Sequence, residues 1–227
     1  MKKRAKNKLN IDWKSKFIDL LIVIIGITIA FQLNNLNDSN KSKAKEKDYL
    51  KSFYEENRDN ESSLSLAIEF TLKTKDDLDS LKQILLSKNY QDNRIKNLSG
   101  SMMALSDFKP SLITMENITA SGDFELIGNF EYREKLIETY NSYQTTSQFE
   151  GLLSNYVNQY VTPFLFDHVR FSDFTPLKEN FTENPVFENI VIGYDALLTQ
   201  KLKGYENNME KLRSLNQLLT AFNSANN

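Results

Sequence analysis

The chain of 227 residues contains no cysteine, which excludes disulfides, thiolate metal sites and a cysteine nucleophile. It has only seven glycines and four prolines, and every proline lies after residue 109. Because these two residue types interrupt helices, their scarcity favours long helices over an architecture of strands and turns. The single histidine, His168, excludes metal sites built from two or three histidines, including the paired Glu-x-x-His motif of di-iron bundles.

Motifs that carry catalytic chemistry are also missing. The sequence holds no glycine-rich phosphate loop, and no serine stands in a nucleophile-elbow context. His168 is expected near a helix end, where a histidine usually caps the helix or meets solvent. The acid-rich stretch EENRDNE, Glu55–Glu61, lacks the turn geometry of a calcium loop and is expected to be a solvated helix face. We therefore predict a protein that is not an enzyme and has no cofactor and no metal site.

What the sequence does contain is a basic tail followed directly by its most apolar run. The tail carries a net charge of +6 within a chain of net charge −2, and its basic residues are Lys2, Lys3, Arg4, Lys6, Lys8, Lys14 and Lys16. The apolar run FIDLLIVIIGITIAFQL, Phe17–Leu33, is at the lower limit of length for a helix that crosses a bilayer. A basic tail beside such a run favours lipid headgroups over nucleic acid as its contact.

Three interpretations of this run are open. A buried helix of a soluble protein would leave the adjacent basic tail unexplained. A cleavable signal peptide would use Leu20–Ile29 as its apolar region and Thr28-Ile29-Ala30 as its cleavage site. A retained anchor agrees better with Phe31 and Gln32, which continue the helix past that site. We expect the retained anchor, although the sequence alone does not decide between retention and cleavage.

The distribution of basic residues predicts the topology. Seven of them precede the run, whereas the segment Asn34–Asp48 after it has four lysines and three acids. Basic residues are retained on the cytoplasmic side of a membrane. We therefore expect a cytoplasmic tail at residues 1–16 and a single-pass transmembrane helix at 17–36 in the cell inner membrane. Residues 37–227 would form a periplasmic domain.

Three apolar stripes at helical spacing follow the anchor. The first extends from Leu50 to Leu85 and predicts one helix that leaves the membrane nearly without a break. The second extends from Leu136 to Phe164, and the third from Phe187 to Phe222. The second stripe contains several tyrosines, whose rings are expected in the core with their hydroxyls at its edge: Tyr140, Tyr143, Tyr156 and Tyr160.

Polar residues and helix breakers predict the connections. Asn89–Ser101 and Thr175–Val186 are expected to be loops, the second of them opening the last helix at Asn184-Pro185. A short helix at Ser111–Ala120 is expected to end with Gly122 in a left-handed conformation.

Asn129 is then a candidate N-cap for the next helix. The expected fold is all-α: a single N-terminal transmembrane helix followed by an extracytoplasmic α-helical bundle, of coiled-coil character, with one very long first helix.

Two short motifs resemble an uncharacterised family of small single-pass Bacteroidota membrane proteins, a domain of unknown function. VIIGITIAFQLNN, Val23–Asn35, is similar to the family's anchor V-I-G-I-x-I-A-x-Q-x-N-N. Asp19 matches an acid that the family, more often with Glu, places seven residues before the glycine. Leu36 departs from the family's usual tryptophan. SGDFELI (Ser121–Ile127), followed by REKLIETYNSY (Arg133–Tyr143), is similar to its second signature, SG-x-x-x-LI. The resemblance implies a single-pass membrane protein and no particular chemistry.

One face of the expected anchor is suited to contact another helix. Five residues share it on an ideal helix: Asp19, Val23, Gly26, Ala30 and Leu33. Gly26-x-x-x-Ala30 is a small-xxx-small pair, which lets a second helix approach closely. A carboxylate within a span tends to face a partner or water. Asp19 is also close enough to the start of the run to reach the inner headgroups.

Two functions agree with this organisation. The first is a membrane-anchored, non-enzymatic interaction or scaffold protein of the bacterial cell envelope. Its partners would be the lipid bilayer and a membrane or periplasmic protein, or a second copy of the chain, and not nucleic acid. The alternative is a single-span signal-relay or ion-coupled subunit of a larger membrane complex. FIDLLIVIIGI, Phe17–Ile27, faintly resembles the opening of proton-coupled stator subunits, which carry an aspartate early in a single span. A hydrolase with an unrecognised site is a weaker third hypothesis.

Overall fold

A computed structural model of the chain describes residues 13–173, 175–178 and 181–225. These residues are predominantly helical and contain no strand, only one isolated bridge between Val169 and Pro176. The all-α fold with a very long first helix is therefore confirmed. Five basic residues of the predicted tail lie outside the described residues: Lys2, Lys3, Arg4, Lys6 and Lys8.

The chain divides into two compact units, Met1–Asp48 and Tyr49–Asn227. Helix α1, Trp13–Leu86, contributes to both of them. In the first unit every described side chain from Lys16 to Leu36 is exposed, apolar ones included. A soluble protein rarely exposes so long an apolar stretch, so the interpretation as a buried core helix does not agree with the structure. The helix is long and apolar enough to cross a membrane.

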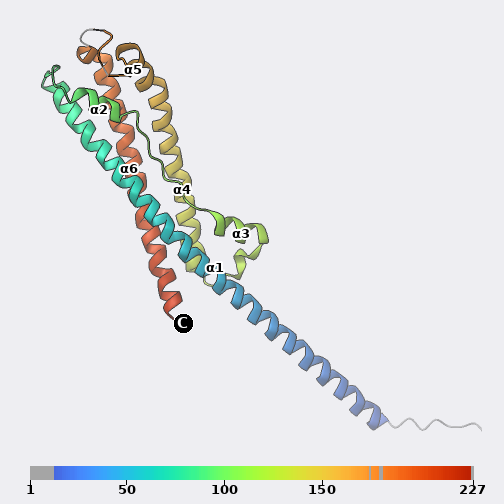
Figure 1. Cartoon of the computed structure of the whole chain (residues 1–227). Coiled ribbons are helices and arrows are strands. Elements are labelled where there is room, and N and C mark those ends of the chain that lie inside the picture. The colour runs from blue at the N-terminus through green and yellow to red at the C-terminus, as the bar shows by residue number, and fades with distance from the viewer. Residues whose placement is uncertain (1–12, 174, 179–180, 226–227) are drawn as a thin grey trace, which may run out of the picture. The chain divides into compact units, whose positions relative to one another are not determined.

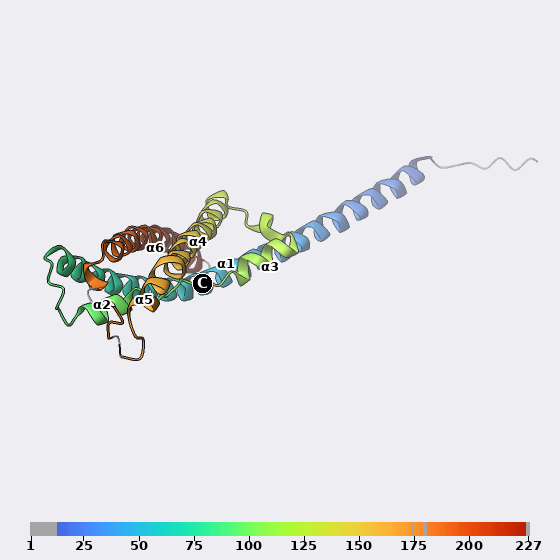
Figure 2. The ribbon, with the colours of Figure 1, turned by 90° about the horizontal axis from the view of Figure 1, so that it is seen from above.

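The second unit is a bundle of three long helical segments (Figures 1 and 2). They are the part of α1 after residue 48, α4 at Phe130–Tyr156 and α6 at Pro185–Ala225. Figure 1 shows α1 and α4 running in one direction and α6 returning in the other. A π-helical turn, η2 at Val157–Val161, continues α4 into α5 at Thr162–His168.

Short elements connect the long helices. They are α2 at Ile95–Ser101, α3 at Ile113–Ser121, and the 3-10 turns η1 at Asp123–Leu126 and η3 at Phe181–Glu183. Residues 104–112, between α2 and α3, are not helical and are called the strap from here on. In Figure 1 the strap leads from α2 back along the bundle to α3.

Two expected loops are therefore partly helical. The prediction for Asn89–Ser101 is wrong over its second half, because Ile95 is buried and Leu98 packs against the core from the next turn of α2. Apolar residues three positions apart are enough to fix a short helix onto a core. Within Thr175–Val186, the turn η3 buries Phe181.

The predicted helix ends are confirmed. Gly122 ends α3 with a φ of 72°, and its N–H donates to the carbonyls of Ile118 and Thr119. The side chain of Asn129 accepts a hydrogen bond of 2.8 Å from the N–H of Glu131 at the start of α4. Pro185 is the first residue of α6, where its missing N–H leaves no helical bond unmade.

The three stripes form the core of the bundle with few exceptions. Ile137 and Tyr160, both assigned to the second stripe, are about half exposed at 47% and 51%. Tyr160 lies in the π-helical turn η2. A π-helical turn inserts an extra residue, which rotates the following side chains relative to a regular helix. The sequence pattern assumed an uninterrupted α-helix and therefore placed Tyr160 on the wrong face.

Helices α4 and α6 approach each other closely because α6 carries glycine at two contact points. A Cβ atom at Gly193 would overlap the ring and hydroxyl of Tyr156, whose hydroxyl donates to the carbonyl of Ile190 at 3.2 Å. A Cβ atom at Gly204 would lie 3.1 Å from the ring of Phe149. These two positions set the separation of the two helices.

Replacing Gly193 with alanine should destabilise the bundle by about 1–3 kcal/mol, because Tyr156 and α4 must move to accept the methyl group. Gly151→Ala is the control, since a Cβ atom there meets nothing within 4 Å. That exposed helical position should gain about 0.5–1 kcal/mol. Thermal unfolding of the full chain in detergent, followed by circular dichroism, measures both. Equal melting temperatures would contradict the proposed role of Gly193.

Candidate functional site

The five residues of the predicted partner face all lie in α1 and are exposed: Asp19, Val23, Gly26, Ala30 and Leu33. No described atom would lie within 4 Å of a Cβ atom at Gly26. The hydroxyl of Thr28, a polar group within the span, donates to the carbonyl of Ile24 at 2.8 Å. An apolar helix that satisfies its own polar groups is suited to lipid. Contact of this face with a partner stays a prediction.

Buried polar side chains of α1 form the first cluster of interest in the second unit. The prediction that Glu55–Glu61 is a solvated face is wrong for Glu56, Asn57 and Asn60, which are buried. Most buried polar groups of proteins have a hydrogen-bond partner. Here the partners come from the strap, α3 and α4, so sequence spacing within α1 could not reveal them.

Glu56 joins α1 to the start of α3. Its Oε2 atom accepts hydrogen bonds from the Thr114 N–H at 2.8 Å, and from the hydroxyls of Thr114 and Ser111, both at 3.1 Å. Its Oε1 atom accepts from the Tyr140 hydroxyl. Burial and the adjacent carboxylate raise the pKa of Tyr140, which keeps this hydroxyl protonated as a donor. Leu112 is the N-cap residue of α3, but its apolar side chain cannot accept a hydrogen bond from the first turn of the helix. The Glu56 carboxylate accepts that bond instead, from the N–H of Thr114.

Asn60, one turn further along α1, pairs with the backbone of the strap. Its Nδ2 atom donates to the Ser111 carbonyl at 3.0 Å, and its Oδ1 atom accepts from the Ser111 N–H at 2.7 Å. This side chain therefore replaces the strand partner that an extended segment would otherwise require.

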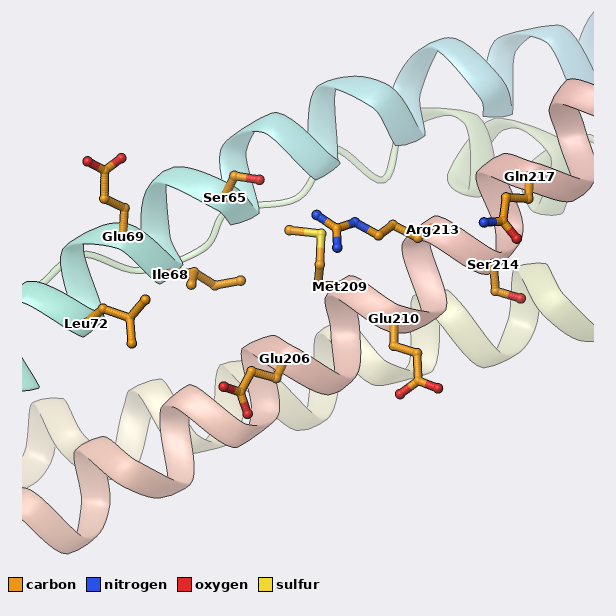
Figure 3. Close-up of a pocket in the computed structure, with 10 residues that line it drawn as sticks. All are labelled: Ser65, Ile68, Glu69, Leu72, Glu206, Met209, Glu210, Arg213, Ser214 and Gln217. Atoms are coloured by element: carbon orange, nitrogen blue, oxygen red, sulfur yellow. The ribbon is translucent and has the colours of Figure 1, made fainter.

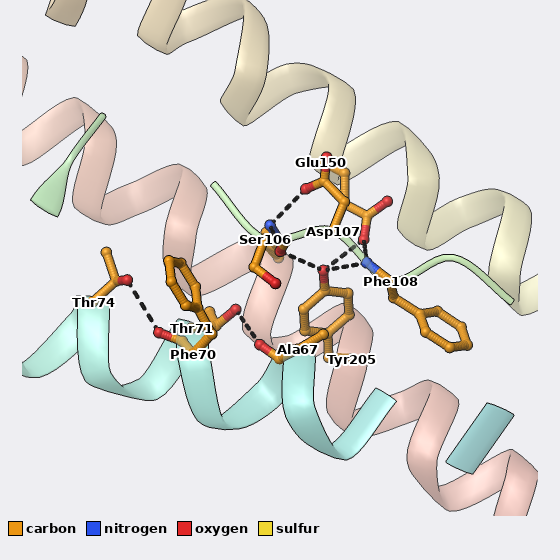
Figure 4. Close-up of polar contacts among 10 residues, drawn as sticks. Ala67, Phe70, Thr71, Thr74, Ser106, Asp107, Phe108, Glu150 and Tyr205 are labelled. Atoms are coloured by element: carbon orange, nitrogen blue, oxygen red, sulfur yellow. Dashed lines mark hydrogen bonds and ion pairs between the residues drawn. The ribbon is translucent and has the colours of Figure 1, made fainter. Parts of the chain in front are cut away.

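A second buried carboxylate holds the middle of the strap (Figure 4). The Oε1 atom of Glu150 accepts from the Phe108 N–H at 2.8 Å and from the Tyr205 hydroxyl at 2.5 Å. Beside it, the almost fully buried Lys201 donates to the Ser106 carbonyl at 2.8 Å and to Asp107 at 2.9 Å. Burial raises the pKa of Glu150, while the hydrogen bonds from Tyr205 and Phe108 oppose that effect.

These clusters fix the strap across α1, α4 and α6. The donors to both oxygens of Glu56 and to the Oε1 atom of Glu150 come from the protein itself, so these acceptor atoms are engaged in the fold. The expectation that tyrosine hydroxyls reach the edge of the core is wrong for Tyr143, which is buried and donates to Asn57 at 3.5 Å. We call this arrangement of the strap, its two carboxylates and their donors the clasp.

Glu150→Gln should make the stability of the bundle less dependent on pH. Because its pKa is raised, the folded carboxyl keeps its proton just above pH 4.5, where the unfolded one loses it. The free energy of unfolding therefore falls as the pH rises from the ordinary pKa of a glutamate, 4.5, through the raised pKa of the folded state. Glutamine retains an acceptor for Phe108 and Tyr205 but has no proton to lose.

Urea unfolding of the full chain in detergent at a series of pH values measures this difference. The variant should lose less stability than the parent as the pH rises above about 4.5. Glu134→Gln, at an exposed position of the same helix, should follow the parent. Parallel curves for the parent and Glu150→Gln would refute the assignment.

A surface groove lies between α1 and α6 (Figure 3). Its volume is about 760 Å³. Apolar side chains, Ile68 and Leu72 of α1 and Met209 of α6, extend between the two helices. The remaining lining is polar or charged: Ser65, Glu69, Glu206, Glu210, Arg213, Ser214 and Gln217.

Polar contacts tie α1 to α6 at one end of the groove and past the other end. At one end Glu61 accepts from Arg213 at 3.1 Å and from Asn216 at 2.9 Å. At the other end Asp195 pairs with Lys75 at 3.0 Å and Lys82 at 2.6 Å. Both lysines also contact Asp79 at 2.8 Å, and their hydrogen bonds lower the pKa of that carboxyl. The groove is therefore a fixed opening between two cross-links.

A second hollow, of about 810 Å³, lies between the strap, α3 and α4. Its walls include Met115 and the aromatic side chains of Phe108, Tyr140 and Tyr143. The rings of Phe108 and Tyr143 are in edge contact, with centroids 5.4 Å apart. Phe108 belongs to the strap, and Tyr140 donates to Glu56, which holds the end of the strap. The hollow is therefore formed by the same side chains that fix the strap to the bundle.

The single histidine caps a helix, as predicted. His168 is the last residue of α5, its Nδ1 atom lies 2.8 Å from the Phe164 carbonyl, and its ring stacks on that of Phe164. Within the part of the chain that the structure describes, no three His, Asp or Glu side chains are grouped to hold a metal ion.

Comparison of the chain with models of protein families, with curated proteins and with solved structures finds no match.

Proposed function

We propose that this protein is a membrane-anchored, non-enzymatic interaction protein of the bacterial cell envelope. The observation that carries the proposal is the contrast between its two units. Residues 16–36 form a mostly apolar helix whose side chains are all exposed, whereas the second unit buries its apolar stripes in a core of its own. An exposed apolar helix requires lipid, and a bundle with a completed core remains free to bind another protein.

The chemistry of the bundle supports binding over catalysis. Its two most buried carboxylates, Glu56 and Glu150, are engaged by donors of the strap, α3, α4 and α6. The groove between α1 and α6 is instead open and lined by apolar and acidic side chains. An apolar groove on a helical surface can take an amphipathic helix of another protein. The motif resemblance at Val23–Asn35 and Ser121–Ile127 agrees with a single-pass envelope protein.

The proposed topology places the N-terminus in the cytoplasm and the bundle in the periplasm. A fluorescent protein that matures only in the cytoplasm, fused after Asn227, should therefore remain dark in living cells. The same fusion to a chain that begins at residue 37 should fluoresce, because it lacks the basic tail and the anchor. Bright fluorescence of the full-length fusion would contradict this topology.

The anchor face is proposed to contact a second membrane helix, of another protein or of a second copy. Gly26→Leu should release proteins that co-purify from detergent-solubilised membranes, because the added side chain prevents close approach. Thr28→Leu adds bulk about 180° away on the helix and should leave the complex intact. Unchanged complexes in both variants would make this face a lipid-facing anchor only.

The alternative, an ion-coupled or signal-relay subunit, rests on Asp19, an exposed carboxyl close to the start of the span. Asp19→Asn distinguishes the two proposals in the same experiment. A stoichiometric polytopic partner whose ion-dependent activity fails in Asp19→Asn would favour the alternative. A partner that is retained with its activity intact would favour the interaction protein.

A further inference from the structure

Beside the groove between α1 and α6, the buried side of α1 carries small side chains. Ala67, Thr71 and Thr74 are buried on the inward side of α1. The hydroxyl of Thr71 donates to the Ala67 carbonyl at 2.7 Å, and that of Thr74 to the Phe70 carbonyl at 3.0 Å (Figure 4). Both hydroxyls are thus satisfied within α1 and do not reach across to α6.

Apolar side chains form the floor of the groove. Met209 is buried against the core, Ile68 is partly buried, and Leu72 is 45% exposed. In Figure 3, Ile68 and Met209 extend toward each other between the helices. An apolar strip between two parallel or antiparallel helices is the surface that a further helix covers in a four-helix bundle.

Carboxylates flank this floor on both sides. Glu69 stands on α1, while Glu206 and Glu210 stand one turn apart on α6, and all three are exposed. Among the described residues none of the three makes an ion pair. The one cation of the lining, Arg213, is already bound to Glu61 at the end of the groove. The surface beside the apolar floor therefore carries net negative charge.

This charge pattern identifies the occupant. We propose that the groove binds a basic amphipathic helix of a partner protein, with its apolar side on Ile68, Leu72 and Met209 and its lysines or arginines beside the three glutamates. The groove extends along α6 from Glu206 to Gln217, so about three helical turns of the partner would fill it. Apolar anchors at i, i+3, i+4 and i+7 with basic flanks match such a surface. The proposal rests on the proposed function and specifies the partner that the bundle takes.

A second copy of this chain does not fit the same surface. Two such grooves facing each other would bring the same glutamates together, and like charges oppose association. The lysine-rich stretch at residues 37–48 has Ala44 as its only apolar residue, so it cannot cover the apolar floor. The proposed topology places residues 1–16 on the other side of the membrane.

Binding of designed helical peptides to the full chain in nanodiscs of zwitterionic lipid tests the proposal. One labelled peptide of about 18 residues carries a leucine stripe and lysines, and its twin carries glutamates in place of the lysines. The lysine peptide should bind, and its affinity should fall with added salt. The glutamate twin should not bind. Failure of the lysine peptide to bind, or equal binding of the twin, would overturn the proposal.

Charge variants locate the binding. Glu69→Gln, Glu206→Gln and Glu210→Gln together should weaken binding about tenfold, because three exposed ion pairs are lost. The control removes the same charge elsewhere, at the exposed residues Glu125, Glu134 and Glu188, and should change the affinity less than about twofold. All six side chains are exposed, so both variants should keep the parent melting temperature. Equal weakening in both would show non-specific attraction and refute the groove.

Cross-linking through a photoreactive side chain tests independently where the lysine peptide binds. Placed at Ser65, which lines the groove, it should cross-link the lysine peptide, whereas at exposed Ser63 on the other side of α1 it should not. Equal cross-linking would refute the site. If the groove variant still captures its envelope partner from membranes, the proposed function stands and this inference fails.

Discussion

The backbone of the strap imposes the constraint on which the bundle depends. A non-helical segment that crosses three helices cannot pair its own N–H and C=O groups, and leaving them unpaired in a core costs about 1–3 kcal/mol each. Glu56, Asn60 and Glu150 supply the missing acceptors and donors from α1 and α4. Each buried carboxylate is in turn compensated by more than one donor, as burial of a charge requires. Through these side chains the strap is bonded to the long helices, although its backbone cannot form regular hydrogen bonds with a helical backbone.

Close packing on one side of the bundle leaves an opening on another. Gly193 and Gly204 allow α6 to lie directly against α4. On the α1 side, two sets of charged contacts hold α6, and an open groove lies between the two helices. Apolar side chains that line an open groove stay in contact with water, which forgoes the free energy of their burial. A partner that fills it would recover that energy, which is a physical reason to regard the groove as a binding surface.

The sequence predicted what depends on local patterns. Helical periodicity identified the long helices, and the residue types at Gly122, Asn129 and Pro185 identified the helix ends, because caps depend on neighbours within a few positions. The buried Glu56 and Asn57 were missed, since their partners lie more than 50 residues away in the chain. The π-helical turn η2 left no pattern that distinguishes it from an α-helix. The groove was missed as well, because no spacing within one helix reveals how far away the next helix lies.

The acidic side chains of this protein divide into two groups with different physical roles. Glu56 and Glu150 are buried and hydrogen-bonded, so replacing either disturbs groups that have no other partner. Glu69, Glu206 and Glu210 are exposed, and among the described residues they form no ion pair, so the fold does not depend on them. Substitution of an exposed charge changes stability by no more than about 0.5 kcal/mol. Their placement on both sides of one apolar floor, at positions where the fold requires no acid, agrees with the proposal that the groove binds a basic helix.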